Sequence, residues 1–408
     1  MRPPTLQYLY LQKPLTLILI IAGLALLPWL AVDSGISHTI VTYFGALAFI
    51  GYSFVFMGRR LKLPEVFTAS LVLITALATL CSLFNDCFEM FYVLCMLIAA
   101  VSLFKWEESK WKQFPWAGLL ALSLATLYNG WFSLILVAFV FALYATMAGN
   151  PFKEVIKRTA LVVILPAIIP AAFFLYTRPH PYWLYPPRTG SIDKVLYYFP
   201  PLIFGFALWI IYSLFSVFGI SPSAAERRRK KENRPPVAEP TETERKVYLF
   251  SIIVTICAFV GFSTTSYKKE INIVLIFPFL SLLIARYATF LTEYRTRVTR
   301  IFGYMLLLFS LLINAAFLAS AFGVSYIFQS ANSFIGKPSF WAKLAEIAES
   351  ALTTPTPLSW ALFSVLLFAQ GTTIYQLSKK VNIKILYSCI GLYLAISLFF
   401  YTSFFLGL

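Results

Sequence analysis

Apolar runs of roughly 20 residues recur along the whole chain, and they restrict its fold more than any other feature. Runs of this length cross a bilayer as helices, because strands of a barrel would alternate apolar and polar residues. We therefore predict an all-α polytopic membrane protein with about 12 or 13 transmembrane helices, forming a single integral membrane domain over residues 1–408. The predicted spans are 15–32, 38–58, 64–84, 88–104, 115–128, 131–148, 159–177, 196–219, 247–265, 271–290, 301–324, 357–377 and 385–405.

The composition excludes most soluble classes. Hydrophobic residues make up 60% of the chain and charged residues 12%, which is more apolar surface than a soluble core can bury. A net charge of +16 would suggest nucleic acid in a soluble protein. In a membrane protein it indicates basic cytoplasmic loops, so no nucleic-acid partner is expected.

Metal-binding and disulfide patterns are sparse. His38 and His180 are the only histidines, and no CxxC pair occurs, so a zinc site is not expected. Cys81 and Cys87 flank one loop and can form a disulfide. The alternative is that they stay free, like buried thiols in general.

The positive charges predict an orientation. If the loop at Arg59, Arg60 and Lys62 is cytoplasmic and the spans alternate, 24 Lys and Arg side chains fall in inside loops and 7 in outside loops. Basic residues are retained on the cytoplasmic side, so this distribution places 178–195 and 265–270 outside.

Two long connections differ in character. Residues 221–246 are rich in charge and proline, which predicts a mobile basic cytoplasmic loop. Such a loop can contact anionic lipid or a partner, or it can be a solvated loop that fixes topology. Residues 328–356 are predicted to lie outside and to contain a short amphipathic helix at the membrane surface.

The aspartates gather on the predicted outer face, whereas most glutamates fall inside. Asp33, Asp86 and Asp193 are the only aspartates, and all three fall there. Lys268 and Lys269 lie on the same face, against the general charge distribution, and charges at such a boundary favour a binding role. Cations at headgroup depth suit a lipid phosphate, and carboxylates suit a general base or a divalent metal such as Mg²⁺ or Mn²⁺.

The outer loop 178–195 combines prolines, aromatic rings and His180. Tyr182 and its aromatic neighbours can stack on a sugar or sit in the interfacial aromatic belt. Together these features favour a membrane enzyme with a lipid-phosphate-linked substrate. An unrelated transporter is a weaker alternative, because the spans carry almost no charged residues in their middle.

The order of several motifs resembles a known family, the C superfamily of polytopic glycosyltransferases with lipid-linked sugar donors. Its lipid A aminoarabinose transferases and bacterial protein mannosyltransferases are the most similar groups. The resemblance covers nearly the whole chain and lies in "YLYLQKP" (8–14), "GRRLKLPEVF" (58–67), "SLFNDCFEMFYVLCML" (82–97), "GLLALSLATLYNGWFSLIL" (118–136), "LYYFPPLIFGFALW" (196–209) and "TTSYKKEINIVLIFPF" (264–279).

The resemblance implies a polyprenyl-phosphate-linked sugar as donor and a lipid or protein as acceptor. It places the active site on the periplasmic or exterior face of the cell inner or plasma membrane. Lys268 and Lys269 would bind the donor phosphate, and Lys13, His180 and Tyr182 are further candidate substrate-binding residues. Asp86 would orient the acceptor or hold a divalent metal; its alternative role is to cap the following helix.

The N-terminal part departs from the family. Gln12 stands where the family has glutamate, and the family's first helix and acidic first outer loop do not precede the motif. Either the true start lies upstream, or the gene is degraded, or the enzyme is rewired. Asp33 is a candidate replacement base. We therefore expect this form to bind donor lipid but to transfer sugar slowly, and a non-catalytic homologue that binds or moves polyprenyl lipids is the alternative. Residues 15–32 either span the membrane or lie on its outer face.

Overall fold

The computed structural model describes residues 38–58, 60–80, 87–177, 196–199, 202, 205–206, 209–210, 241–264, 270–294, 296–321, 357–379 and 382–405. Within this part the chain is helical, which confirms the all-α polytopic class. Five helical segments are long and apolar enough to cross a membrane: Met90–Glu108, Phe152–Phe173, Glu242–Thr264, Asn272–Thr289 and Val298–Ala315. The chain divides into two compact units, which are described separately.

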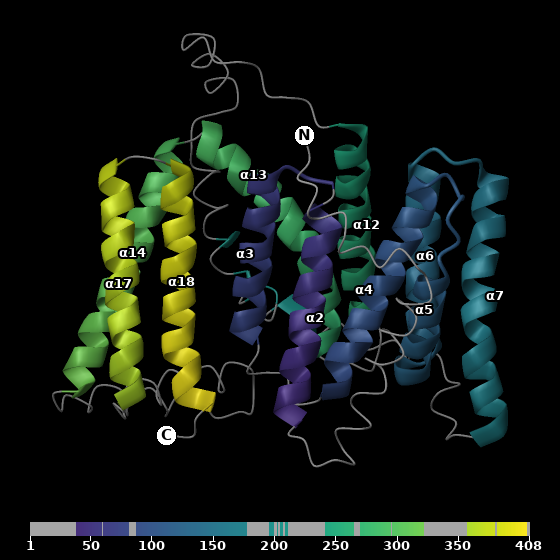
Figure 1. Ribbon diagram of the computed structural model, residues 1–408, viewed down its shortest axis with the longest axis horizontal. Coiled ribbons are helices and arrows are strands. Elements are labelled where there is room, and N and C mark those ends of the chain that lie inside the picture. The colour runs from purple at the N-terminus through teal and green to yellow at the C-terminus, as the bar shows by residue number, and fades with distance from the viewer. Residues whose placement is uncertain are drawn as a thin grey trace, which may run out of the picture. The chain divides into compact units, whose positions relative to one another are not determined.

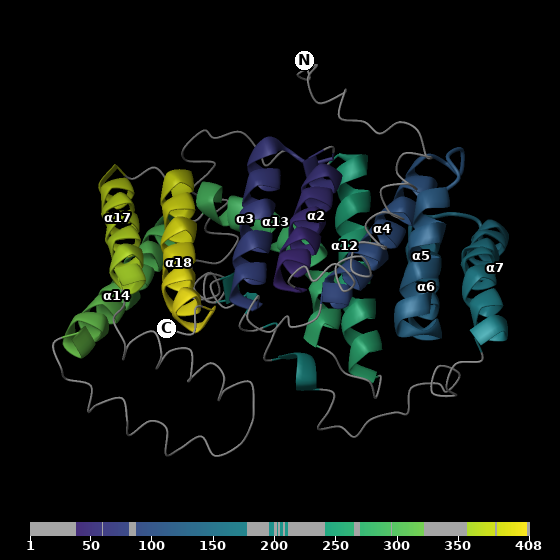
Figure 2. The ribbon, with the colours of Figure 1, turned by 60° about the horizontal axis from the view of Figure 1, so that its bottom comes forward.

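Unit 1 is a bundle around α4 (Figures 1 and 2). Helix α4 packs against α2, α5, α6 and the 3₁₀ segment η5, and 89% of its spanning window is buried. Tilted and edge-on aromatic rings fill the interior, among them Phe104 and Phe250 at 4.9 Å between centroids. The elements are α2 (His38–Gly58), α4 (Cys87–Glu108), α5 (Trp116–Asn129), α6 (Trp131–Met147), α7 (Phe152–Thr177), η4 (Leu196–Tyr198), α12 (Glu242–Thr264) and η5 (Glu270–Ile276).

Short connections in unit 1 depend on glycine. Gly130 separates α5 from α6 with φ 73°, and Gly149 follows α6 with φ 86°. Residues with a Cβ rarely adopt this left-handed backbone conformation. The predicted break at Asn129-Gly130 is therefore confirmed, and it depends on the glycine itself.

Helix α7 contains Pro166 and Pro170 and still runs for 26 residues. Pro170 has no N–H for the carbonyl of Pro166, four residues earlier. The hydroxyl of Ser123 on α5 donates to that carbonyl at 3.0 Å. A neighbouring helix therefore satisfies the backbone group that proline leaves free inside the apolar layer.

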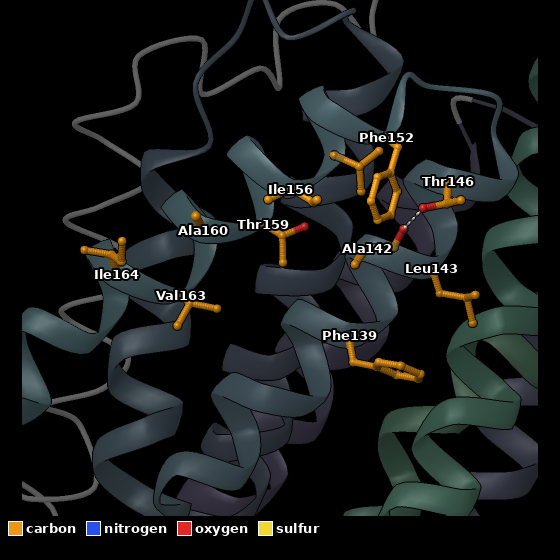
Figure 3. A pocket seen from close by; sticks show the side chains of 11 residues that line it. Phe139, Ala142, Leu143, Thr146, Phe152, Ile156, Thr159, Ala160, Val163 and Ile164 are labelled. Atoms are coloured by element: carbon orange, nitrogen blue, oxygen red, sulfur yellow. Dashed lines mark hydrogen bonds between the residues drawn. The ribbon is translucent and has the colours of Figure 1, made fainter.

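An apolar groove of about 580 Å³ lies between α6 and α7 (Figure 3). Phe139 and Leu143 line it from α6, and Phe152, Ile156 and Ile164 line it from α7. Several of these side chains are largely exposed, because α6 and α7 do not close against each other along this stripe.

Unit 2 is built on a hairpin of α17 (Pro357–Lys379) and α18 (Asn382–Phe405), with α14 (Thr296–Ala321) packed on both (Figures 1 and 2). Helix α3 (Leu63–Leu80) packs on α18. Gln370 of α17 links this helix to α14 through side-chain hydrogen bonds. It accepts from Asn314 at 2.8 Å and donates to Ser310 at 3.0 Å. Such polar contacts join helices in an apolar layer.

The predicted span 271–290 is confirmed by the candidate membrane span Asn272–Thr289, and the structure adds a change of helix type within it. Residues Glu270–Ile276 form η5, and α13 (Phe277–Tyr294) begins only afterwards. Pro278 has no N–H to continue an α-helix from the preceding turn, whereas it is tolerated in the first turn of a new helix. Residues 272–276 are all buried, so the irregular backbone is shielded from lipid.

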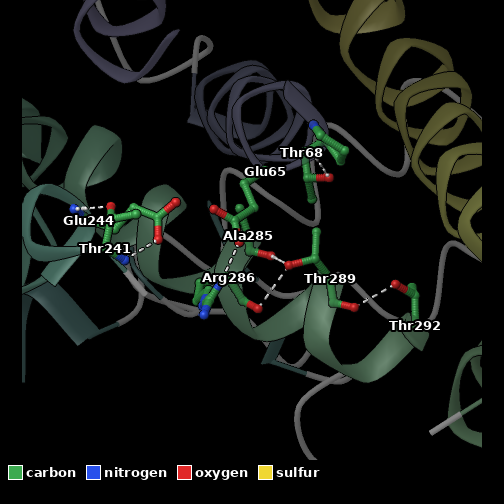
Figure 4. Close-up of polar contacts among 9 residues, drawn as sticks. Glu65, Thr68, Thr241, Glu244, Ala285, Arg286, Thr289 and Thr292 are labelled. Carbon is green, nitrogen blue, oxygen red and sulfur yellow. Dashed lines mark hydrogen bonds and ion pairs between the residues drawn. The ribbon is translucent and has the colours of Figure 1, made fainter. Parts of the chain in front are cut away.

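The predicted mobile loop 221–246 is too long by several residues, because α12 begins at Glu242. The N–H of Thr241 donates to the Glu244 carboxylate at 2.9 Å, and the N–H of Glu244 donates to the Thr241 hydroxyl at 3.3 Å (Figure 4). This reciprocal capping box is encoded in "TETE" and was overlooked in the sequence. Residues 221–240 and 328–356, and the span 15–32, lie outside the described part.

Cys95, Cys257 and Cys389 are buried free thiols. Cys81 lies outside the described residues, so the alternative disulfide with Cys87 stays a prediction.

Candidate functional site

One end of unit 1 gathers the described residues that flank the predicted ligand-binding segments (Figure 1). Helix α2 begins there at His38 and α4 begins there at Cys87, while α7 ends there at Thr177 and α12 at Thr264. We call this the outer end, after the orientation that the charge distribution predicts.

Aromatic and hydroxyl groups fix the helices at the outer end. Tyr92, in the second turn of α4, stacks on Tyr128 of α5 with 5.4 Å between ring centroids. The Ser133 hydroxyl of α6 donates to the Tyr92 hydroxyl at 3.3 Å. Tyr92 and Ser133 are buried, and their contacts position the start of α4.

The segment η5 is anchored at the same end. It packs against α4 and α12. Asn272 is buried, and its amide donates to the Tyr198 hydroxyl of η4 at 3.5 Å. Phe262 of α12 lies against Tyr198 and against Phe132 of α6. The segment η5 is thus held by contacts from three other elements, α4, α12 and η4.

The predicted site residues themselves lie outside the described part of the chain. This applies to the candidate catalytic residues Asp86 and Asp33 and to the candidate binding residues, and their roles stay predictions. Asp86 directly precedes α4, and Lys269 directly precedes η5, two elements that pack against each other. The binding candidates are Lys13, Lys268, Lys269, His180 and Tyr182.

At the opposite end of unit 1, a buried carboxylate was missed in the sequence. Glu107 of α4 is 4% exposed. It accepts hydrogen bonds from the Tyr144 hydroxyl at 2.9 Å and from the Asn150 amide at 3.2 Å, and Lys246 of α12 pairs with it at 3.2 Å. The sequence feature that could have indicated this buried carboxylate is the pair of glutamates at the end of an apolar run, in "KWEES".

Two further ion pairs join distant parts of the sequence. In unit 1, Arg60 pairs with Glu108 and lies over the rings of Phe56 and Phe104 at 5.2 and 5.3 Å. In unit 2, Arg286 of α13 pairs with the buried Glu65 of α3 (Figure 4). These carboxylates are occupied by cations, which favours a structural role over catalysis.

The described residues contain no group of three His, Cys, Asp or Glu side chains that could hold a metal ion. Asp86 lies outside this part, so a Mg²⁺ or Mn²⁺ bound there stays a prediction.

Comparison with known proteins finds likeness only among solved structures. No protein-family model matches the chain, and no curated protein matches it. The crystal structure of ArnT from Cupriavidus metallidurans bound to undecaprenyl phosphate is 16% identical, with a TM-score of 0.57 over 94% of this chain and 66% of that one. The apo structure of the same protein is 16% identical, with a TM-score of 0.55 over 89% of this chain and 62% of that one.

The chain therefore spans about two thirds of the length of the ArnT structures that it resembles. ArnT is a lipid A aminoarabinose transferase, one of the groups that the sequence motifs resemble. At this identity the likeness establishes the fold: the chain is an integral membrane protein with the polytopic fold of the aminoarabinose transferase ArnT.

Proposed function

We propose that this protein is a membrane glycosyltransferase that uses a polyprenyl-phosphate-linked sugar as donor and a lipid or protein as acceptor. The observation that carries the proposal is the shared fold, over 94% of the chain, with a structure that holds undecaprenyl phosphate. The outer-face motifs of the sequence add to it. The reaction would take place on the periplasmic or exterior side of the inner or plasma membrane.

In this proposal Lys268 and Lys269 bind the donor phosphate. Two adjacent cations at headgroup depth suit a phosphate through charge-assisted hydrogen bonds. The anchoring of η5 by Asn272 and Tyr198 supports the assignment, since the segment that follows the lysines is fixed in the bundle. A fixed attachment limits the entropy lost when the lysines bind a ligand.

The transfer replaces one bond at the anomeric carbon by another and moves one proton. The acceptor hydroxyl oxygen bonds to the anomeric carbon, the bond from that carbon to the phosphate oxygen breaks, and polyprenyl phosphate leaves. The hydroxyl proton passes to a carboxylate, for which Asp86 and Asp33 are the candidates. Lys13, His180 and Tyr182 would contact the donor or the sugar. We assign no step to a metal ion.

Binding is tested first. We expect Lys268→Ala with Lys269→Ala to weaken binding of undecaprenyl phosphate to the purified protein by at least about tenfold, since each lysine near a lipid phosphate contributes roughly 1 kcal/mol. The matched control removes Lys110 and Lys112, an exposed pair at the opposite end of unit 1. Equal affinities of the two double variants would refute the assignment.

Transfer is tested separately, with a polyprenyl-phosphate sugar and an extract of membrane lipids and proteins as acceptors. Loss of labelled product in Asp86→Asn, with donor binding retained, would support a catalytic carboxylate, and the same comparison applies to Asp33→Asn. Donor binding without product in the unsubstituted chain would favour the alternative, a non-catalytic protein that binds or moves polyprenyl lipids.

A further inference from the structure

We propose that the groove between α6 and α7 is a binding site for an anionic glycerophospholipid. One acyl chain would occupy the groove, and the phosphate would contact Lys153 and Lys157. This site lies away from the outer end, near the start of α7, and does not depend on the proposed transferase activity.

Two helical stripes form the groove (Figure 3). Its lining residues recur at helical spacing, so each helix presents one continuous face. From Phe152 to Ile164 the α7 stripe extends about 18 Å, compared with about 15 Å for half the hydrocarbon layer of a bilayer. The lining comprises Phe139, Ala142, Leu143 and Thr146 of α6, and Phe152, Val155, Ile156, Thr159, Ala160, Val163 and Ile164 of α7.

The protein does not fill this space. Phe152 is 70% exposed and Ile164 59%, although they lie on the face that α7 turns toward α6. Only 22% of the α7 spanning window is buried, against 89% for α4. In a membrane the groove is filled by hydrocarbon, and its length fits a chain from one leaflet.

The start of α7 supplies cations beside the groove. Lys153 and Lys157 each follow a lining residue, Phe152 and Ile156, by one position, and both are exposed. Among the described residues neither has a carboxylate within 4.0 Å. Arg158, in contrast, pairs with Glu154 at 3.4 Å and lies over the Trp106 ring at 5.4 Å, so it attaches α7 to α4. The two lysines are therefore the cations available to a ligand.

A hydroxyl inside the groove points to the same ligand. The Oγ1 atom of Thr159 is buried and has no hydrogen-bond partner in the described structure, whereas the Thr146 hydroxyl donates to the Ala142 carbonyl at 2.8 Å (Figure 3). Thr159 lies on the lining face of α7, three residues, or about 4.5 Å along the axis, beyond Ile156. An ester carbonyl just below a phosphate bound to Lys157 can accept from this hydroxyl. Basic pockets between transmembrane helices are known to take anionic headgroups in this way.

The headgroup part is tested by native mass spectrometry of the full chain in detergent, titrated with phosphatidylglycerol or phosphatidylcholine. We expect the unsubstituted protein to prefer phosphatidylglycerol. Lys153→Ala with Lys157→Ala should reduce phosphatidylglycerol affinity about tenfold and abolish the preference. The control pair is Lys379→Ala with Lys384→Ala, two exposed lysines on α17 and α18. Equal affinities of the two pairs would overturn the proposal.

The acyl-chain part is tested by filling the groove. Ala160→Phe should weaken the binding of both lipids severalfold. Ala361→Phe, at an exposed alanine of α17 outside the groove, should leave both affinities unchanged. Unaltered lipid binding in Ala160→Phe would overturn the proposal. The proposal would also be overturned if the unsubstituted chain formed a dimer and Ala160→Phe dissociated it, because the groove would then hold a second copy of the chain.

Discussion

At the scale of single residues, Glu107 shows how a charge is retained inside an apolar bundle. Its carboxylate receives a hydroxyl, an amide and an ammonium group from α6, the turn after it and α12. A buried carboxylate is tolerated only when its oxygens are hydrogen-bonded and its charge is balanced. Glu107 therefore connects three parts of unit 1 at the end where α12 begins.

We expect Glu107→Ala to destabilise the protein by about 2–3 kcal/mol, because Tyr144, Asn150 and Lys246 would lose their shared acceptor. The effect can be measured as a lowered melting temperature in detergent. Glu154→Ala is the matched control: Glu154 is 42% exposed and pairs with Arg158 within one helix. Glu154→Ala should lower the stability of the protein by less than about 0.5 kcal/mol. Similar shifts for both variants would contradict the role given to Glu107.

At the scale of elements, the contact between α4 and α5 depends on small side chains. A Cβ atom at Gly118 would lie 2.5 Å from the Ser102 Cβ and 3.4 Å from the Ala99 carbonyl oxygen. Small residues allow helices in an apolar layer to approach closely, and dispersion contacts then hold them together. This pair is among the most closely packed in unit 1 because neither helix carries bulk at the crossing.

We predict that Gly118→Ala destabilises the protein by about 1–3 kcal/mol through overpacking, although alanine favours helices. Combining it with Ser102→Gly should recover much of the loss. Gly51→Ala, in α2, has nothing within 4 Å of the added Cβ and should be neutral or slightly stabilising. Thermal unfolding of the variants makes the comparison, and a Gly118→Ala protein as stable as Gly51→Ala would refute the close crossing.

At the scale of the whole molecule, the alternation of helices determines which loops share a side. In unit 1 the contacts of Arg60, Glu107 and Arg158 bring the basic loops after α2, α4 and α6 to one end. That end is the one the charge distribution predicts to be cytoplasmic. The outer end, with the starts of α4 and η5, then faces the opposite side.

This orientation predicts the location of reporters fused to the chain. A reporter within 221–240 should be cytoplasmic, and one within 180–192 should be periplasmic, because the basic residues of the first loop oppose translocation. Paired fusions with one enzyme active only in the cytoplasm and one active only outside make the measurement. Reversed locations at both sites would place the candidate site on the wrong side of the membrane for the proposed function.

The sequence by itself determined the class of the protein and most element positions. Hydropathy is a property of local segments, so the span predicted at 38–58 coincides with α2, and Gly130 marked a real break. Motif order also identified the fold that the ArnT structures confirm. Local chemistry, such as the capping box of Thr241 and Glu244, was present in the sequence as well, although it was overlooked.

Only the tertiary structure decided which charges meet and where the backbone leaves the α-helix. Arg60 and Glu108 are 48 residues apart, and Arg286 and Glu65 are 221 apart, so no local pattern could pair them. The 3₁₀ path of η5 requires burial by α4 and α12, which shields its backbone from lipid. The open groove between α6 and α7 depends in the same way on how two separate apolar faces approach, because packing in three dimensions selects among faces that hydropathy alone treats as equal.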